Sequence, residues 1–540
     1  MPDYLGRLVD LPPRVDVLRK AGLLDPMRPD EGIRSIVAVR RLGPIAGAAQ
    51  IAARRSPHAL AMVDELGPLT FAELDQRSNA LARAWREHGL GPGSVVAVLC
   101  RDHRWLVDCM LAAAKLGACL LLMNTGFSRP QLADVAEREG VSALVYDEEF
   151  TELLDAVRTD IPRYLAWSNS PADAGPDLVK LADLVASTAG SPVPNPPSAG
   201  HVVLLTSGTT GTPKGAPRQV RSPLAATHLL ERIPLRRDGA MFIASPMFHA
   251  TGLSQLIMTL ALGSTVVVRR RFDPEATLRA VADNNCTSLV LVPTMLRRIL
   301  DLGPEVHRRY DTSRLSVILT AGSVLTPDVS DRTLDVFGDV LYNLYGSTEV
   351  AVATVATPVE LRAAPGTVGR PPRGCLVRLY DGDGHRVREP NVRGRVFVGS
   401  ELAFGGYTDG GRKEIIDGLL SSGDIGHFDE HGLLFVDGRD DDMIVSGGEN
   451  VFPVEIENLL VARPDVADAA VIGVSDADFG QRLLAFVVPA DGSSVDPDEV
   501  KAYVRANLAR YKVPRDVILL DELPRNPTGK VLRSKLAAMA

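Results

Sequence analysis

Helix and strand patterns alternate along the N-terminal half of the chain. Thr70 and Glu73 have the spacing of a capping box in front of an amphipathic helix that ends near Gly89. The same order of patterns then repeats, with strands predicted at 95–99, 119–123 and 143–146 and helices at 104–115 and 128–140. Such alternation predicts a parallel sheet covered by helices.

The alternation resumes after a Pro-, Ser- and Gly-rich stretch at 187–200, which predicts a surface linker. A helix at 274–284 and strands at 288–292 and 315–319 predict a second α/β layer. From 366 to 436, short apolar runs separated by Asp-Gly pairs are typical of hairpins and predict a small β-rich subdomain.

The last hundred residues form a separate pattern, with helices predicted at 454–461 and 496–508 and strands at 469–474 and 483–488. The adjacent carboxylates of Asp440, Asp441 and Asp442 repel one another and favour an exposed connection that could act as a hinge. We therefore expect an α/β fold with two parts. A large N-terminal domain of layered α/β subdomains plus a β-rich subdomain covers 1–437, and a small mobile α+β domain covers 438–540.

Composition narrows the class of protein. The chain has 540 residues, of which 45% are hydrophobic and 23% charged, as in a soluble globular protein with at least two folded domains. Its net charge of −8 disfavours a nucleic-acid partner. The five cysteines form no C-x-x-C pair, which favours reduced core thiols in a cytoplasmic protein.

The sequence predicts neither a signal peptide at the N-terminus nor a membrane span in the interior. Pro12 and Pro13 interrupt the N-terminal stretch where a signal peptide needs an unbroken apolar core. Two apolar stretches, 105–123 and 252–268, contain polar residues and fit buried helix-then-strand segments. We expect no transmembrane segment, while peripheral membrane contact stays open.

The stretch TSGTTGTPKG at 206–215 follows an apolar run and has the chemistry of an anion cradle. Its glycines expose backbone N–H groups, its hydroxyls add donors and Lys214 adds a charge. It is not the standard P-loop, because Lys214 follows Pro213 and precedes Gly215. Taken alone, the stretch fits a mobile polar loop equally well.

Five further stretches occur in a fixed order: PMFHATG at 246–252, YGSTE at 345–349, SSGDIG at 421–426, GRDDDMIVSGGENVFPVEIE at 438–457 and PRNPTGKVLR at 524–533. Together with the first, they resemble the signatures of the adenylate-forming superfamily of acyl-CoA synthetases, luciferases and peptide-synthetase adenylation domains. The resemblance covers roughly residues 45 to 535. It implies that ATP, Mg²⁺ and CoA are the cofactors and that a carboxylic acid is joined to AMP before a thiol displaces the AMP.

The resemblance also assigns site residues. Glu349 corresponds to the Mg²⁺ ligand, with Thr348 beside it, and Lys530 to the catalytic lysine that bridges the attacking carboxylate and the α-phosphate. The implied phosphate-binding residues are Thr206, Ser207, Gly208, Thr209, Thr210, Gly211 and Lys214. The implied nucleoside-binding residues are Gly322, Ser323, Asn343, Tyr345 and Gly346 around the adenine, and Asp424 and Arg439 at the ribose.

In the C-terminal part, Asp441 corresponds to the family's hinge position. The loop of Ser446, Gly447 and Gly448 corresponds to the thiol tunnel, where glycines let a pantetheine arm pass close to the backbone. An ordinary β-turn explains these glycines as well. His249 is a candidate wall of the acyl pocket or simply a packed residue.

Taken singly, three of these residues have ordinary explanations: Glu349 as a helix-cap acid, Asp424 as a turn residue and Lys530 as a solvated lysine. Only their joint occurrence favours the site. The chain also departs from many relatives, because Ala321-Gly322-Ser323 stands in the adenine motif and no aromatic residue precedes Asp424 closely. We therefore expect a differently shaped adenine pocket.

Three stretches indicate the branch of the superfamily. No acid lies within 245–253, which disfavours amino-acid substrates, and the run at 441–457 resembles ligases that use CoA. The segment LRKAGLLDPMRPDEG before the shared core is similar to bacterial fatty acyl-CoA synthetases. We expect a ligase for a medium or long fatty acid. The alternatives are a ligase for an aryl or other acid, a ligase that loads a carrier-protein thiol, and a non-catalytic binding relative, which the intact set of site residues disfavours.

Overall fold

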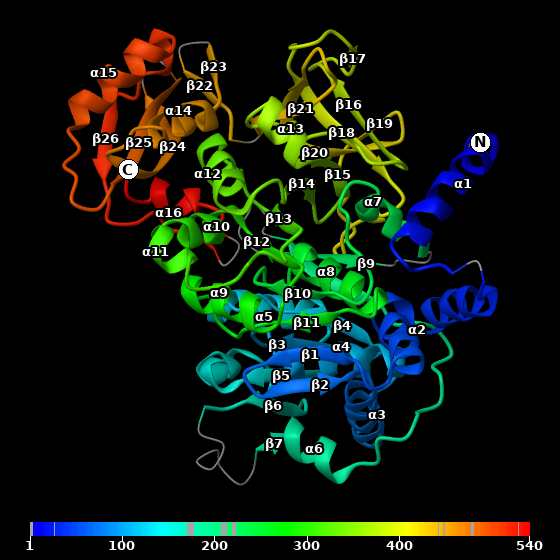
Figure 1. The fold of residues 1–540 in the computed structure, drawn as a ribbon. Coiled ribbons are helices and arrows are strands. Elements are labelled where there is room, and N and C mark those ends of the chain that lie inside the picture. Colours follow the sequence, from blue (N-terminus) through cyan, green and yellow to red (C-terminus); the bar gives the residue numbers. More distant parts are fainter. Residues whose placement is uncertain are drawn as a thin grey trace.

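The computed structural model describes residues 4–25, 27–169, 178–206, 213–218, 223–440, 442–446, 449–476, 480–526 and 529–540. Two large sheets with helices lie in the lower and middle parts of Figure 1, and a β-rich subdomain and a C-terminal domain lie side by side above them. The expected α/β fold with a large N-terminal part and a small C-terminal part is confirmed.

The first sheet has strand order β7-β6-β5-β3-β4-β8-β9 and is parallel except for the β8–β9 hairpin. Its strands are β3 (Val95–Leu99), β4 (Cys119–Leu122), β5 (Ala143–Asp147), β6 (Arg163–Trp167), β7 (Val179–Lys180), β8 (Val202–Thr206) and β9 (Lys214–Arg218). Its helices are α3 (Phe71–Glu87), α4 (Arg104–Leu116), α5 (Arg129–Arg138), η1 (Glu148–Ala156) and α6 (Leu181–Ser187).

The second sheet has strand order β15-β14-β13-β12-β10-β11-β1-β2. Its strands are β1 (Leu60–Asp64), β2 (Gly67–Thr70), β10 (Ala240–Ile243), β11 (Thr265–Val267), β12 (Ser288–Leu291), β13 (Val317–Ala321), β14 (Leu341–Ser347) and β15 (Ala351–Ala356). Its helices are η2 (Pro223–Ala226), α7 (Thr227–Leu230), α8 (Ala250–Ala261), α9 (Pro274–Asp283), α10 (Pro293–Leu300), α11 (Gly303–His307), α12 (Pro327–Phe337) and α13 (Pro358–Ala363).

A shared core joins the two sheets. Because side chains alternate along a strand, Val96 and Val98 of β3 face this core while Ala97 and Leu99 face a separate outer core. Helix α4 lies in the shared core and is buried on nearly all sides, which explains its largely apolar sequence. Its buried Asp108 and Lys115 are paired with Arg77 and Asp75 of α3. The apolar stretches at 105–123 and 252–268 are α4 with β4 and α8 with β11, as expected.

The β-rich subdomain and the C-terminal domain each have their own sheet. The first contains β16 (Cys375–Tyr380), β17 (Arg386–Val387), β18 (Gly394–Ser400), β19 (Ile415–Ile416), β20 (Leu419–Phe428) and β21 (Leu434–Arg439). The second contains β22 (Ile444–Ser446), β23 (Glu449–Val451), β24 (Val466–Asp476), β25 (Gly480–Pro489) and β26 (Asp516–Leu519), with α14 (Pro453–Val461), α15 (Pro497–Asn507), η3 (Arg510–Lys512) and α16 (Arg533–Ala537).

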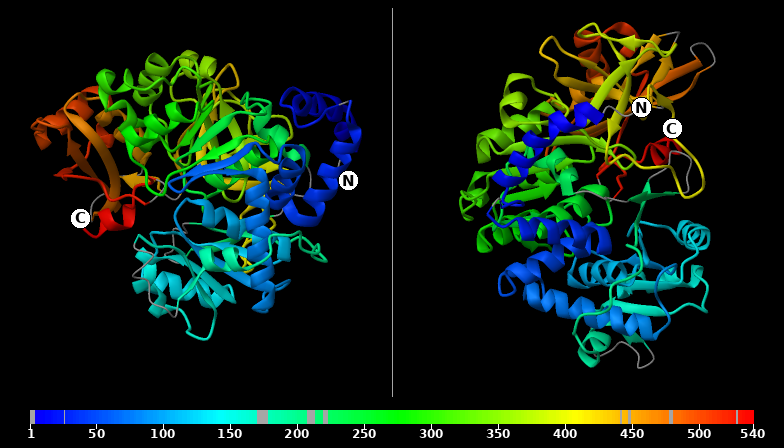
Figure 2. Two further views of the ribbon diagram at one scale, coloured as in Figure 1. Left: turned by 60° about the horizontal axis from the view of Figure 1, so that its bottom comes forward. Right: turned by 90° about the vertical axis from the view of Figure 1, so that its right-hand side faces the viewer.

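Two helices precede the first sheet, α1 (Tyr4–Lys20) and α2 (Pro29–Arg55). They lie at the edge of the molecule away from the C-terminal domain in Figures 1 and 2. Among the described residues, α2 is the one helix long and apolar enough to cross a membrane by length and composition. Its helical geometry is broken at Gly43, and half of its most apolar window is buried in the protein.

The connection between the two domains differs from the expectation in one respect. Asp440 and Asp442 do not stand exposed and unpaired, because Asp440 lies 3.2 Å from Arg395 and Asp442 lies 3.4 Å from Arg533. Each carboxylate is thus neutralised by an arginine that is distant in sequence. The predicted boundary at 437/438 falls inside β21.

Candidate functional site

The predicted site residues gather where strand ends of the first two sheets meet the β-rich subdomain. Thr206 ends β8 and Lys214 begins β9, Gly322 and Ser323 follow β13, and Asn343, Tyr345 and Gly346 lie on β14. Asp424 and Arg439 are paired across β20 and β21. Ligands of open α/β sheets bind at such carboxyl ends of parallel strands.

The phosphate-loop residues that the structure describes lie at the open end of the β8–β9 hairpin. Thr206 and Lys214 are partners in the antiparallel register, and the Thr206 hydroxyl donates to the Lys214 carbonyl oxygen over 3.3 Å. The Lys214 ammonium lies 3.3 Å from an Asp409 carboxylate oxygen and 5.4 Å from the centre of the Tyr407 ring. An anion entering this site would therefore compete with Asp409 for the lysine.

Glu349 is held by two hydroxyl groups. The Tyr407 hydroxyl donates to one carboxylate oxygen over 2.6 Å, and the Ser347 hydroxyl donates to the other over 2.8 Å. Burial by itself raises the pKa of Glu349, but these hydrogen bonds and the Lys413 charge lower it below its ordinary value. An ionised carboxylate bonded to the Ser347 hydroxyl, with Thr348 next to it in the sequence, offers the oxygen ligands that suit Mg²⁺.

The turn that presents Glu349 depends on one glycine. A Cβ atom at Gly346 would lie 1.8 Å from the Ala351 carbonyl oxygen, so no larger residue fits where β14 and β15 pair. On the neighbouring strand, Asn343 is buried and its side-chain oxygen accepts from Thr320 over 3.2 Å. The Ser323 hydroxyl is buried without a hydrogen-bond partner among the described residues, which suits a site that a ligand completes.

Tyr345, Asp424 and Arg439 form one cluster. The Tyr345 hydroxyl donates to Asp424 over 2.5 Å, and the Arg439 guanidinium lies 3.6 Å from the other oxygen of the same carboxylate. Burial raises the pKa of Asp424, while the charges of Arg439 and Lys530 oppose the rise. The carboxylate keeps lone pairs for further donors, such as the two hydroxyls of a ribose.

Lys530 lies on the C-terminal domain, near enough to this cluster for its charge to oppose the rise that burial causes in the pKa of Asp424. The Lys530 backbone N–H donates to the Asn526 side chain over 2.9 Å, and the neighbouring Gly529 packs against Thr294 of α10. A second contact joins the domains, because Arg297 donates to the Ala467 carbonyl oxygen over 2.7 Å. These two contacts hold the C-terminal domain against α10, with Lys530 near the nucleoside cluster.

The remaining predicted residues lie at the edges of this group. His249 precedes α8, its Nε2 atom is buried without a partner among the described residues, and burial lowers its pKa to about 4. Ser446 lies on β22, where it pairs with Glu449 and Gly480. Eight predicted site residues lie outside the described residues: Ser207, Gly208, Thr209, Thr210, Gly211, Asp441, Gly447 and Gly448.

Sequence reasoning missed Tyr407, Asp409 and Ser347. Tyr407 contacts both Lys214 and Glu349, although 58 residues separate it from Glu349. The segment after β18 carried no pattern that pointed to either contact. Ser347 could have been found, because a hydroxyl two residues before an acid can bond it locally.

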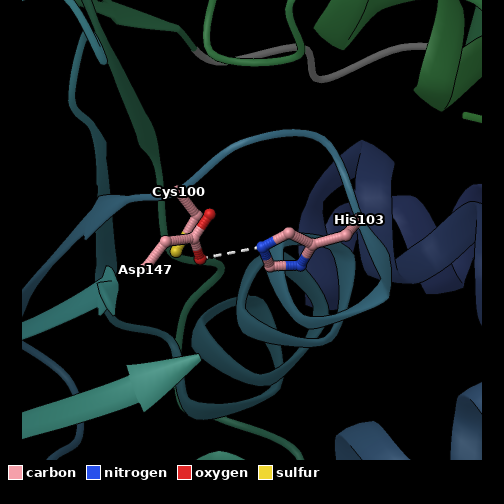
Figure 3. Close-up of side chains that lie close together, drawn as sticks. All are labelled: Cys100, His103 and Asp147. Carbon is pink, nitrogen blue, oxygen red and sulfur yellow. Dashed lines mark hydrogen bonds and ion pairs between the residues drawn. The ribbon is translucent and has the colours of Figure 1, made fainter. Parts of the chain in front are cut away.

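A second polar cluster lies outside this site. Figure 3 shows Cys100, His103 and Asp147, with His103 Nε2 bonded to an Asp147 oxygen at 2.8 Å. The other Asp147 oxygen accepts from the Arg101 backbone N–H at 3.0 Å and lies 3.3 Å from Arg270, and burial raises the pKa of the Cys100 thiol. A neutral thiol and an arginine disfavour a bound cation, so this cluster is a hydrogen-bonded part of the core.

A layered α/β domain with these groups at one edge, met by a small domain that presents a lysine, has the architecture of adenylate-forming enzymes. Residues 49–408 match the model of the AMP-binding enzyme family, and residues 455–530 match that of the AMP-binding enzyme C-terminal domain. The chain therefore belongs to the AMP-binding enzyme family.

Curated relatives span nearly the whole chain. A feruloyl-CoA synthase from Amycolatopsis sp. is 35% identical over 90% of this chain and 96% of its own length. An indoleacetate–CoA ligase from Aromatoleum aromaticum is 33% identical over 86% and 91%. A fatty acid–[acyl-carrier-protein] ligase, ScoC, from Streptomyces coeruleorubidus is 30% identical over 90% and 94%.

A solved structure is similar in fold as well as in sequence. The o-succinylbenzoate CoA synthetase from Bacillus subtilis, in complex with its acyl-adenylate, has a TM-score of 0.77 and 26% identity over 91% of this chain and 97% of its own. The predicted class of AMP-forming acid–thiol ligases is thereby confirmed, and ATP, Mg²⁺ and CoA are the cofactors of adenylate-forming CoA ligases. The fatty acid predicted as substrate is not specifically supported.

Proposed function

We propose that this protein activates an aromatic carboxylic acid with ATP and transfers the acyl group to CoA. The proposal rests on the acids for which the similar ligases are named. Feruloyl, indoleacetate and succinylbenzoate groups all contain an aromatic ring. This replaces the fatty acid expected from the early segment before the shared core.

In the first step, a carboxylate oxygen of the acid attacks the α-phosphorus of ATP, and the bond to the pyrophosphate oxygen breaks. Lys530 would contact both anions, and Lys214 with the Thr206 end of the hairpin would hold the departing phosphates. Glu349 and Thr348 would hold Mg²⁺, which neutralises phosphate charge when bound. In the second step, the CoA sulfur attacks the acyl carbon and AMP leaves.

The nucleoside would lie between the Tyr345 ring and the loop of Gly322 and Ser323. The unpartnered Ser323 hydroxyl offers a hydrogen bond to the base, and Asp424 accepts from the ribose hydroxyls. His249, uncharged near neutral pH because its pKa is about 4, would offer one polar contact to the acyl group beside the Phe248 ring.

A medium- or long-chain fatty acid remains the second candidate, because ScoC is named a fatty acid ligase. The same relative keeps a carrier-protein thiol as an alternative acceptor. These two alternatives differ from the main proposal only in the acid that is activated or in the thiol that accepts the acyl group. The adenylating step would use the same residues.

Product analysis by mass spectrometry tests the proposal. Purified protein is incubated with ATP, Mg²⁺ and separate aryl, aryl-alkyl and fatty acids, with and without CoA, and an Asp424→Ala variant serves as the inactive control. We expect an acyl-CoA from ring-containing acids. Fatty acyl-CoA as the dominant product would overturn the choice of acid, acyl-AMP that persists with CoA would overturn the choice of acceptor, and no adenylate from any acid would favour a non-catalytic relative.

A further inference from the structure

Helix α1 and the first half of α2 lie before the segment that matches the enzyme family, which begins at residue 49. The second half of α2 packs against α3, α4 and α8 as part of the shared core. The first half begins at Pro29 and ends at the break at Gly43, on the edge of the molecule away from the C-terminal domain (Figures 1 and 2). Helix α1 and the first half of α2 thus lie outside the part of the chain that matches the family model.

Buried contacts fix how α1 and the first half of α2 lie against the rest of the protein. Ala38 and Leu42 are buried on one face of this half of α2. In α1, Leu18 is buried, and the buried Arg14 guanidinium lies 3.0 Å from Glu401 on the β-rich subdomain. The opposite face of α2 consequently points to solvent.

Three aliphatic residues form a stripe on that solvent face. Ile33, Ile36 and Val37 are 64%, 41% and 40% exposed, and their spacing of three and four residues places them on one side of the helix. Met27, in the connection before the helix, is 87% exposed. Adjacent exposed aliphatic residues of this kind mark an interaction surface on a soluble protein.

The charge of this element is opposite to that of the whole chain. Residues 14–41 contain seven basic and four acidic residues, a net charge of +3, whereas the chain as a whole has −8. Arg34, Arg40 and Arg41 flank the aliphatic stripe and are exposed. Arg34 contacts Asp30 at 3.5 Å, while Arg40 and Arg41 have no acidic partner within the described part of the chain.

We propose that this face, Met27, Ile33, Ile36 and Val37 flanked by Arg34, Arg40 and Arg41, docks on the surface of an anionic lipid bilayer. A helix that presents aliphatic side chains beside arginines lies in the plane of the interface, with its apolar side chains among the acyl chains and its guanidinium groups at the headgroups. The excess of positive charge selects anionic lipid.

Two other roles for this face, spanning a bilayer and contacting a second copy of the chain, fit the observations less well. The helix does not span a bilayer, because its second half is fixed in the protein core beyond the Gly43 break. A second copy of the chain would place the same basic face against itself in a two-fold interface, and the like charges would repel.

Vesicle sedimentation of the full chain tests the proposal. The probes are phosphatidylcholine vesicles and vesicles with equal parts of phosphatidylcholine and phosphatidylglycerol. We expect binding to the mixed vesicles that decreases with added salt. Replacing Ile33, Ile36 and Val37 together by serine, or Arg40 and Arg41 together by glutamate, should each weaken this binding by roughly tenfold or more.

The matched control is the pair Val359→Ser and Ile415→Ser, which removes two exposed aliphatic residues from other parts of the surface (74% and 57% exposed). It should bind vesicles as the native protein does, and the thermal transitions of all variants should coincide. No binding of the native protein, or equal loss in the control, would overturn the proposal. A dimer measured by light scattering that the serine variant abolishes would identify the face as a contact between copies.

Discussion

Tyr407 holds together two side chains that belong to different elements of the site. Its hydroxyl donates to Glu349, and its ring faces the Lys214 ammonium. A hydrogen bond to a candidate metal ligand fixes the direction of the ligand's lone pairs. Tyr407 is thus a positioning residue for a carboxylate that the sequence already singled out.

Replacing Tyr407 by Phe removes this hydrogen bond and keeps the ring beside Lys214. We expect the Mg²⁺ concentration for half-maximal adenylate formation to rise by about tenfold, because the carboxylate is no longer held in one direction. Magnetic resonance of Mn²⁺ in the presence of ATP measures the same loss without turnover. Tyr380→Phe is the control, since its hydroxyl donates to Asp417 over 2.8 Å away from the site; equal behaviour of the two variants would refute the role.

The raised pKa of the buried Asp102 carboxyl should make the stability of the fold depend on pH. Burial raises its pKa from 3.8 to about 7, and one oxygen accepts from the Met247 backbone N–H at 3.0 Å. The native state therefore keeps a proton that the unfolded chain loses above its own pKa. This contribution to stability is present at low pH and is lost as the pH rises to about 7.

Asp102→Asn keeps the acceptor oxygen and cannot ionise. The gain in unfolding free energy over the native protein should be larger at pH 8 than at pH 5, by up to about 3 kcal/mol. Denaturant unfolding at both pH values measures the difference, with the exposed Asp491→Asn as control. A gain that is the same at both pH values would contradict the assignment.

At the scale of elements, the segment that contains Lys530 contacts α10, because the backbone at Gly529 lies close to the Thr294 side chain. Gly529 has a φ of +76°, and a Cβ atom there would lie 2.3 Å from the Thr294 hydroxyl oxygen. Position 529 thus sets how near Lys530 comes to the nucleoside cluster.

Gly529→Ala should displace this segment and slow adenylate formation by roughly tenfold, because small displacements of reacting groups are costly. Gly492→Ala is a matched control in the same domain, with a similar φ of +74° and no neighbour within 4 Å. It carries the same backbone strain of about 1 kcal/mol without the clash. Adding Thr294→Ala should recover part of the rate, and absence of any recovery would argue against the contact.

At the scale of the whole molecule, the placement of the C-terminal domain decides which step the enzyme can perform. Lys530 lies near enough to Asp424 for its charge to oppose the rise that burial causes in the pKa of that carboxyl, while β22 and β23 pair with each other within the sheet of the C-terminal domain. This placement suits formation of the adenylate. The sequence resemblance implies that the loop at 446–448 lines the path of CoA. Transfer of the acyl group to the thiol then requires a different placement of the C-terminal domain.

Lys530→Ala should therefore reduce adenylate formation by roughly a hundredfold or more, because one charged contact to the reacting anions is lost. The reaction of supplied acyl-AMP with CoA should stay nearly unchanged. Single-turnover measurement of each half-reaction separates the two, with the exposed Lys535→Ala as control. Equal loss in both half-reactions would show that Lys530 does not act in one placement only.

The amino-acid sequence by itself determined the alternation of helices and strands in the α/β layers and the identity of the family, while α1 and α2 were not predicted. The capping box of Thr70 and Glu73 forms as predicted, with the Thr70 backbone N–H donating to Glu73 at 2.7 Å, because it involves residues three positions apart. Strands such as β3 and β12 lie within one or two residues of their predicted bounds, since apolar periodicity acts over the same short range.

Only the tertiary structure decided which distant residues meet. The Tyr407–Glu349 hydrogen bond, the Lys214–Asp409 ion pair and the arginines beside Asp440 and Asp442 join segments tens to hundreds of residues apart. Such contacts depend on how whole sheets pack against one another. The local pattern of apolar and polar residues does not predict that packing. The direction of the aliphatic stripe on α2 was likewise set by what covers its other face.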